Sequence, residues 1–245
     1  MQIRTRVRRL AALCLGALVA ATPVLGNGDA RQSYTISVAG LRVGTMEMAV
    51  NTSGSRYTAR GKVTGGGLVG VFVNVSFDGT ASGSMRGDGS LMPASYRATS
   101  GSGRKAQSVD MKYAGGTPTG ASFSPPRRPA KPWDVAPPSQ GGTLDPISAA
   151  YDILRDRPVG TACGRSIRIF DGARASQIRI GARRDDGALS SCAGVYSRGA
   201  GFSPKRLEEQ RDFRFVIYYD RSAGEMQVTR FELDSILGQA VARRR

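Results

Sequence analysis

The sequence predicts an all-β protein: a curved antiparallel sheet or an incompletely closed β-barrel, with one main helix on its concave side. Three observations support this fold class. Apolar and polar residues alternate along many short segments, as they do in strands with one buried face. Turns rich in Gly, Asp and Asn separate these segments. Apolar residues recur convincingly at helical spacing only in the stretch 145–156.

The N-terminus has the features of an export signal. Four arginines at positions 4–9 precede the apolar run Leu10–Ala21, which is too short to span a bilayer comfortably. We expect cleavage after Gly26, with a second option near 28–30; an uncleaved anchor is the alternative. No later run is long enough to cross a membrane. Residues 27–238 should therefore form a single exported β-rich domain, followed by a solvated basic tail at 239–245.

The segments after the signal predict an antiparallel meander with short polar connections. The expected strands lie at 34–38, 43–50, 57–63, 77–85, 92–99 and 107–113. The run 68–75 is almost entirely apolar, so periodicity does not decide its state, and we expect a short helix or turn at 68–72 that leads into a strand.

A proline-rich, basic loop at 124–142 interrupts the strand pattern. Proline cannot donate a hydrogen bond to a central ladder, so this segment should lie on the surface. It contains the only tryptophan, Trp133, which we expect to pack over an exposed face of the sheet.

A helix at 145–156 and a hairpin follow this loop. Asp145 is a good N-cap, and Pro146 suits the first helical position because its missing N–H is not needed there. Asp171-Gly172 is a strong signal for the turn of a hairpin over 166–180. The remaining pattern predicts a turn at 184–187 and strands that begin at 191, 211 and 226. In the last strand the apolar residues change phase, which indicates either a bulge or a strand with apolar residues on both faces.

The amino-acid composition excludes several classes of catalytic and metal site. Histidine is absent, which excludes His-dependent triads and most zinc enzymes. The adjacent acid pairs Asp185-Asp186 and Glu208-Glu209 stand in polar contexts and should be solvated. We therefore predict no catalytic residue, no metal site and no cofactor, and a hydrolase is the least favoured function.

The net charge and the cysteines indicate which partners and which redox compartment to expect. The formal charge is +16, and loss of the four arginines of the signal leaves +12. This balance suits anionic partners such as phospholipid head groups, although a generally basic surface explains it more simply. No aromatic-interleaved basic motif predicts nucleic-acid binding. Cys163 and Cys192 form an even pair, which in an oxidising compartment favours a disulfide worth on the order of 3 kcal/mol. Buried free thiols are the alternative, and a metal held by this pair is a weaker one.

The order of these features resembles one exported bacterial family, known as domain of unknown function 3108. The residues that carry the resemblance are Tyr34 with Gly40-Leu41 and Val43-Gly44, Gly66-Gly67-Leu68, Leu91-Met92-Pro93 with Tyr96, Leu144–Ala149, Asp171-Gly172, and Cys192 with Tyr196 and Gly201-Phe202. The proline-rich insert around Trp133 departs from the pattern. The resemblance implies a periplasmic protein of a Gram-negative bacterium, and it brings no established catalytic residue. By analogy, the fold should be similar to the half-barrels of periplasmic lipoprotein carriers.

These observations favour a non-enzymatic periplasmic protein that binds a hydrophobic or lipid-like ligand in cell-envelope maintenance. A curved sheet with a helix on its concave side can enclose an apolar pocket. Candidate lining residues are Met46, Met48, Val50, Val109, Met111 and Phe213; the simpler reading of the same residues is an ordinary core. The alternative function is a protein–protein adaptor in envelope assembly, with the basic surface and the proline-rich loop as its contacts.

Overall fold

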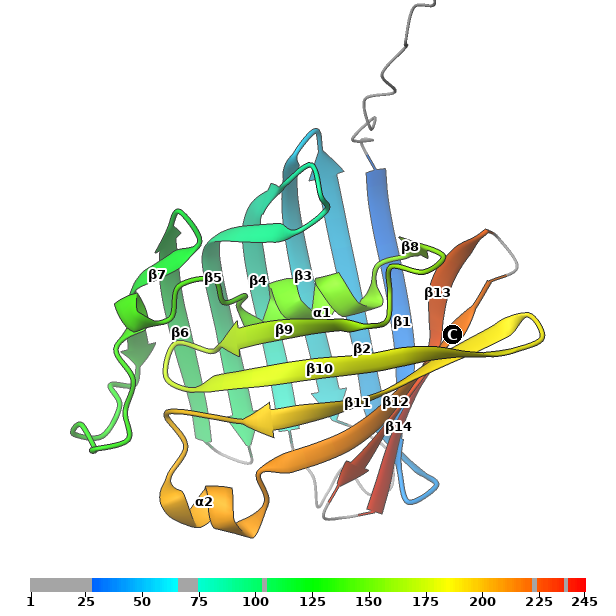
Figure 1. Cartoon of the computed structure of the whole chain (residues 1–245). Coiled ribbons are helices and arrows are strands. Elements are labelled where there is room, and N and C mark those ends of the chain that lie inside the picture. The colour runs from blue at the N-terminus through cyan, green and yellow to red at the C-terminus, as the bar shows by residue number, and fades with distance from the viewer. Residues whose placement is uncertain (1–27, 66–74, 103–104, 222–223, 236–237) are drawn as a thin grey trace, which may run out of the picture.

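The computed structural model describes residues 28–65, 75–102, 105–221, 224–235 and 238–245, which form one sheet around a helix (Figure 1). The first strands are β1 (Gly28–Val38), β2 (Leu41–Ser53), β3 (Arg56–Gly65), β4 (Val75–Met85), β5 (Leu91–Ser102), β6 (Lys105–Ala114) and β7 (Thr117–Ser124). They are followed by η1 (Pro137–Ser139), α1 (Pro146–Leu154), β8 (Arg157–Pro158), β9 (Arg165–Phe170), β10 (Ala175–Asp186), β11 (Leu189–Arg198), α2 (Pro204–Glu209), β12 (Asp212–Asp220), β13 (Glu225–Ser235) and β14 (Gly238–Arg244).

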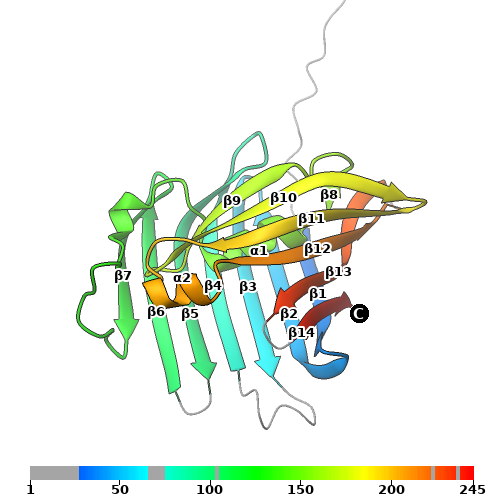
Figure 2. The same cartoon turned by 60° about the horizontal axis from the view of Figure 1, so that its bottom comes forward.

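The strands form two antiparallel meanders, β1–β7 and β9–β14, which are joined where β1 pairs with β14. Strands β1–β7 pair with their successive neighbours, as do β9–β14, and β14 pairs with β1. Figures 1 and 2 show the second meander lying across the first, with α1 between them. The path ends at β7 on one side and β9 on the other, and within the described residues these two strands are not paired. The predicted fold, an incompletely closed sheet with its helix on the concave side, is confirmed.

The expectation of a frayed basic tail at 239–245 is wrong. Strand β14 pairs along both edges, because Ala242 lies opposite Ile36 of β1 and opposite Phe231 of β13. Arg245 also donates its backbone N–H to the Ser33 carbonyl at 2.9 Å. Without β14, the edge of β1 would expose a row of unpaired backbone N–H and C=O groups. The C-terminal segment is therefore the seam that joins the two meanders.

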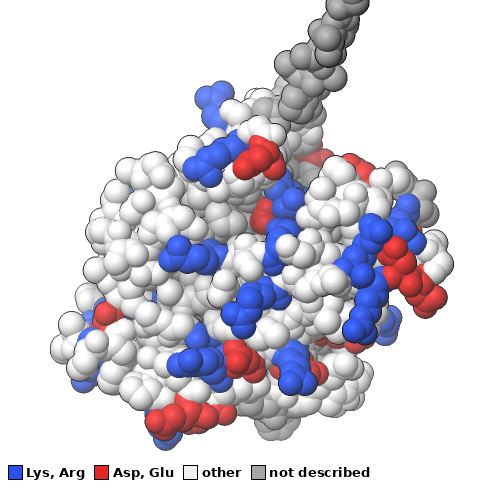
Figure 3. Space-filling model, viewed as in Figure 1, with Lys and Arg blue, Asp and Glu red and all other residues white. Residues whose placement is uncertain are grey.

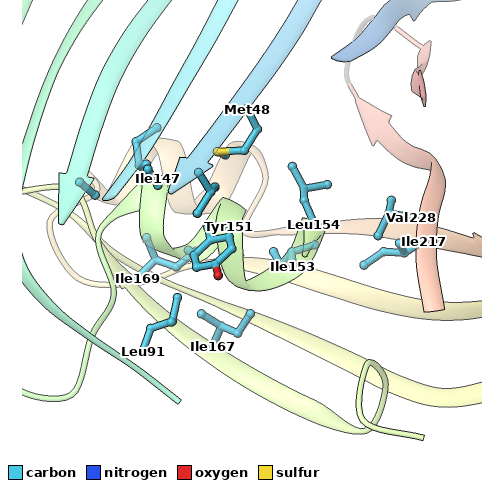
Figure 4. Close-up of a cluster of buried hydrophobic side chains, with 14 of the residues drawn as sticks. Met48, Leu91, Ile147, Tyr151, Ile153, Leu154, Ile167, Ile169, Ile217 and Val228 are labelled. Carbon is cyan, nitrogen blue, oxygen red and sulfur yellow. The ribbon is translucent and has the colours of Figure 1, made fainter. Parts of the chain in front are cut away.

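Helix α1 fills the space between the meanders. Its residues Ile147, Tyr151 and Leu154 are buried, and Figure 4 shows them between Met48 of β2 and the isoleucines of β9. Fully burying an aliphatic or aromatic side chain contributes roughly 1.5–3 kcal/mol. The helix thus stabilises the crossing of the two meanders and forms the centre of the core.

Polar side chains stabilise both ends of α1. Asp145 caps the N-terminus by accepting the backbone N–H groups of Ile147 and Ser148, both at 2.9 Å. The helix ends at Leu154, two residues before its predicted end. At the C-terminal end Asp152 accepts hydrogen bonds from Arg155 at 2.7 Å, from Arg157 at 2.5 Å and from Arg165. Burial lowers the pKa of the Arg157 guanidinium to about 10, although the Asp152 carboxylate opposes this.

The predicted disulfide is present. Cys163, after β8, is bonded to Cys192 in β11, with a Cα–Cα distance of 5.9 Å that is ordinary for such a bridge. Cys192 is fully buried. The bond therefore ties the segment after the helix to the middle of the second meander.

Several local predictions need adjustment. The turn predicted at 184–187 is shorter, because residues 184–186 pair with β11. Strand β7 and helix α2 were not predicted, whereas the predicted bulge is found in β13, opposite Tyr218 and Tyr219. The predicted signal at 1–26 and most of the apolar run that includes 68–72 lie outside the described residues.

Candidate functional site

The open side of the sheet is spanned by the segment that leads into α1. The backbone N–H of Gly142 donates to the Gly116 carbonyl in the β6–β7 turn at 3.0 Å. Leu144 then forms a short parallel bridge with β9, because its N–H donates to Arg168 and its carbonyl accepts from Phe170. The Gly201 N–H donates to the Trp133 carbonyl at 3.0 Å, which links the proline-rich loop to the β11–α2 connection. The irregular segment between β7 and α1 thus lies across the gap between the edge strands β7 and β9.

A cavity of about 450 Å³ lies beneath this cover. The first meander contributes residues of β4 to β7, and the second contributes the β9–β10 turn and the β11–α2 connection. The lining residues are Phe77, Tyr96, Ala98, Ser100, Gln107, Val109, Phe123, Arg127, Arg128, Trp133, Pro146, Asp171, Ala173, Arg174, Gly201, Phe202, Ser203 and Arg206. The site therefore joins segments far apart in the sequence, and its wall includes the aromatic rings of Phe77, Tyr96, Phe123, Trp133 and Phe202.

The β9–β10 turn closes one wall of the cavity by packing tightly against the first meander. Asp171 holds the turn by accepting the backbone N–H groups of Ala173 at 2.9 Å and Arg174 at 2.7 Å. Gly172 has a positive φ of 96°, and a Cβ placed there would lie 2.9 Å from Val109 Cγ2. Glycine is needed here both for the backbone conformation and for the close approach.

Four arginines surround the apolar part of the cavity. Three of them lie over aromatic rings: Arg127 over Phe123 at 5.3 Å, Arg128 over Trp133 at 5.6 Å and Arg174 over Phe202 at 5.3 Å, each from Cζ to the ring centroid. The fourth, Arg206, lies at the exposed rim, and its guanidinium has no hydrogen bond or ion pair within the described part of the chain. Stacking against a ring occupies the face of a guanidinium and leaves its N–H edge available.

Two aspartates offset part of this charge. Asp134 lies 3.4 Å from both Arg127 and Arg128, and Asp171 lies 2.9 Å from Arg174. A backbone hydrogen bond from Lys131 lowers the pKa of Asp134, as do the two arginines, so its carboxylate is charged at neutral pH. Burial raises the pKa of the Tyr96 phenol well above its usual value, and Asp145 and Asp171 act in the same direction. Among the described residues, the site therefore has four positive charges against two negative ones.

The predicted lining residues are distributed over several places. Val109 lines the 450 Å³ cavity, whereas Met48 and Val50 line a separate cavity of about 200 Å³ near the C-terminal end of α1, and Val50 also lines a cavity of about 490 Å³ on β1 to β5. Met111 is fully buried in the core and Met46 is partly buried against it. Phe213 packs on Tyr196 with a centroid distance of 5.9 Å and beneath Arg198. The structure thus does not bring the six residues together in one pocket.

The polar groups at the start of α1 form a closed hydrogen-bonded chain. Tyr57 and Ser148 are joined through their hydroxyl oxygens at 2.7 Å, and Ser148 Oγ donates to Asp145 Oδ2 at 2.5 Å. All three residues are buried. Burial raises the pKa of the Asp145 carboxyl to about 6, although the hydrogen bonds from Ser148 and Ile147 lower it. This arrangement serves the helix cap, as the sequence predicts for Asp145 and Pro146.

The acid pairs considered as hydrolase candidates lie away from the cavity. Asp185 is 41% exposed and forms ion pairs with Arg183 and Arg221. A hydrogen bond from Ser190 lowers its pKa. Glu208 and Glu209 are exposed on α2. Across the described residues no group of three or more Cys, Asp or Glu side chains could hold a metal ion, and no helix there is long and apolar enough to cross a membrane.

The comparisons with known proteins give a family and a distant structural likeness. The chain is similar to the crystal structure of a β-barrel-like protein of domain of unknown function DUF1849 from Brucella abortus, with 14% identity, a TM-score of 0.49, and coverage of 91% of this chain and 97% of that chain. At this identity and TM-score the likeness indicates nothing about function. No curated protein matches the chain. A family model described as protein of unknown function (DUF3108) matches residues 33–242, and the chain therefore belongs to this family.

Proposed function

We propose that this protein is an exported, periplasmic binding protein that takes part in cell-envelope maintenance and holds a hydrophobic or lipid-like ligand at the open side of its sheet. The observation that carries this proposal is the cavity of about 450 Å³ between the two meanders. Its size falls within the range of roughly 300–1,000 Å³ that is usual for small-molecule sites. Phe77, Val109 and Phe123 give it apolar surface that a hydrocarbon chain can contact.

The proposed role is binding without catalysis. The chain has no histidine to act as an acid–base group. The two buried carboxylates of the α1 region have structural partners: Asp145 accepts the hydrogen bonds of the helix cap, and Asp152 is surrounded by three arginines. Neither Asp145 nor Asp152 lines the 450 Å³ cavity. These features support a site that retains its ligand unchanged.

A blocking variant tests the site. Ser100 is an exposed residue of β5 that lines the cavity, whereas its neighbour Thr99 faces the other side of the strand. Ser100→Trp should fill the mouth of the cavity, and Thr99→Trp is the matched control. The mature protein, purified from its native host, should contain extractable lipid and bind a fluorescent fatty acid. Ser100→Trp should lose both properties and Thr99→Trp should retain them. A wild-type protein without lipid and without probe binding would contradict the proposal.

Export is tested separately. Strand β1 begins at Gly28, so cleavage after Gly26 would leave the whole strand in the mature protein. We expect the protein in the periplasmic fraction, with an intact mass that starts at Asn27. Recovery from the cytoplasm with residues 1–26 attached would contradict the proposed location.

An adaptor role remains the second proposal, and one feature favours it. Strand β7 is at the end of the sheet path and has a single strand neighbour, β6, among the described strands. Such an edge can accept a strand from a partner protein. A pull-down from envelope extract should then recover a partner that Gly120→Pro, a change in β7, fails to recover; equal recovery by both proteins would argue against pairing at this edge.

A further inference from the structure

The charge around the cavity narrows the class of ligand. Figure 3 shows basic side chains spread over the visible face with acidic ones beside several of them, so a positive surface alone does not mark a site. The cavity differs because four arginines line it together with aromatic rings, and the acidic residues beside them in the described part of the chain are Asp134 and Asp171. A neutral hydrophobic ligand would leave this excess charge without a partner.

Three of the arginines contact aromatic rings and carboxylates in the absence of a ligand. The contacts with Phe123, Trp133 and Phe202 restrict these side chains, so less side-chain freedom is lost when their N–H donors meet an anion. Arg127 and Arg128 share the single carboxylate of Asp134 at 3.4 Å, which is a long contact for a charged hydrogen bond. Their donors are therefore only partly satisfied by the protein.

Other donors at the site are also available. The guanidinium of Arg206 has no hydrogen-bond or ion-pair partner among the residues that the structure describes. The Nε1–H of Trp133, which lines the same cavity, is buried and likewise has no partner there. A buried N–H without a partner is unfavourable, so a ligand oxygen at this position would be stabilised.

We propose that the cavity binds a single-chain amphiphile with an anionic head group, a carboxylate or a phosphate, whose apolar chain lies against Phe77, Val109 and Phe123. The head group is held by the guanidinium of Arg206 and by those N–H donors of Arg128 and Arg174 that Asp134 and Asp171 leave free. Guanidinium binds both carboxylate and phosphate through paired N–H donors. This inference rests on the proposed function, because it assigns a ligand class to the same cavity.

The test compares ligands of equal chain length below their micelle concentrations. Laurate, dodecyl phosphate, dodecanol and dodecyltrimethylammonium should be titrated into the mature protein by calorimetry, with inorganic phosphate as the head group alone. Laurate or dodecyl phosphate should bind at least roughly tenfold more tightly than dodecanol, because each gains charged hydrogen bonds to arginine. Inorganic phosphate should bind more weakly than dodecyl phosphate. The preferred anion distinguishes a carboxylate from a phosphate head group.

Matched variants assign the effect to the site. Arg206→Gln should weaken laurate or dodecyl phosphate roughly fivefold to tenfold and leave dodecanol unchanged. Arg42→Gln removes one charge from an exposed residue outside the cavity and should have no effect on either. Equal binding of anionic and neutral amphiphiles, or equal losses in the two variants, would overturn the assigned ligand class but leave the cavity as a hydrophobic site. If no amphiphile binds at all, the proposed function fails as well.

Discussion

The buried carboxylate of Asp145 allows a prediction about whether burial or hydrogen bonding has the larger effect on its pKa. Asp145 is 0% exposed and accepts hydrogen bonds from the backbone of Ile147 and Ser148 and from Ser148 Oγ. Burial raises a carboxyl pKa, whereas hydrogen bonds to the charged form lower it. Burial is the larger effect here, and it raises the pKa from 3.8 to about 6. Asp145→Asn keeps the shape and the cap but removes the charge.

The sign and size of the stability difference between the wild type and Asp145→Asn follow from proton linkage. The folded protein holds the Asp145 proton more tightly than the unfolded chain, so this residue favours folding most below pH 4. Its contribution is lost as the pH rises from about 4 to 6, and it is constant above that range. A pKa that moves from 3.8 to about 6 corresponds to about 3 kcal/mol, at roughly 1.4 kcal/mol per pH unit. Asp145→Asn should therefore match the wild type near pH 4 and exceed its stability by up to about 3 kcal/mol at pH 7.

The assay is urea unfolding of both mature proteins at pH 4, 5, 6 and 7, followed by circular dichroism. Other carboxylates titrate in both proteins, so they cancel in the difference between the two unfolding free energies. Asp145→Ala is a second control: it also lacks the charge but loses the cap, and should lie about 1 kcal/mol below Asp145→Asn at every pH. A constant difference between wild type and Asp145→Asn, or one that grows in favour of the wild type as the pH rises, would refute the reasoning. The first outcome would show that the hydrogen bonds cancel the effect of burial on the pKa, and the second that they outweigh it.

Three further predictions concern the fold. Cys163→Ala combined with Cys192→Ala should lower the unfolding free energy by on the order of 3 kcal/mol, and the denatured mature protein, which lacks Cys14, should show no free thiol in a thiol titration; two reactive thiols would exclude the bond. Gly172→Ala should destabilise by roughly 2–4 kcal/mol through its positive φ and its contact with Val109, whereas Gly187→Ala, with nothing near its added Cβ, should cost about 1 kcal/mol. Equal losses in thermal melts would argue against tight packing at Gly172. Deleting residues 238–245 should abolish cooperative unfolding, because it removes the strand that joins the two meanders. If the shortened protein unfolds at the same urea midpoint as the wild type, these residues act only as a tail.

The strand pattern and the helix were predictable because their signals are local. Alternation along 34–63 and the cap formed by Asp145 and Pro146 need only a few neighbouring residues, and both are found where expected. The role of β14 was not predictable in the same way. Its run of arginines is typical of a solvated tail, whereas its pairing depends on β1, some 200 residues earlier in the chain. Strand β7 is obscured because Pro118 and Gly120 are unfavourable in a central strand and are tolerated at an edge.

The cavity was only partly predictable for a related reason. Periodicity identifies which side of a strand faces inward, but not whether the space there is filled. Met111 and Val109 share one face of β6, yet Met111 is buried in the core and Val109 lines the cavity. The arginines come from three separate segments whose meeting depends on the fold. The available signals were the basic, proline-rich stretch that contains Arg127 and Arg128, and the Ser203-Pro204 helix start before Arg206.

The position of the cavity follows from the incomplete closure of the sheet. An open sheet has two edges whose backbone groups need partners or cover. The segment between β7 and α1 covers the β9 edge, since Leu144 bridges to β9, and Gly142 ties this segment to the β6–β7 turn. Irregular chain fills space less completely than a paired strand would, and a hollow is left beneath it. Because the same segment carries Trp133 and its neighbouring arginines into the wall of that hollow, the residues that protect the sheet edges also determine what the cavity can bind.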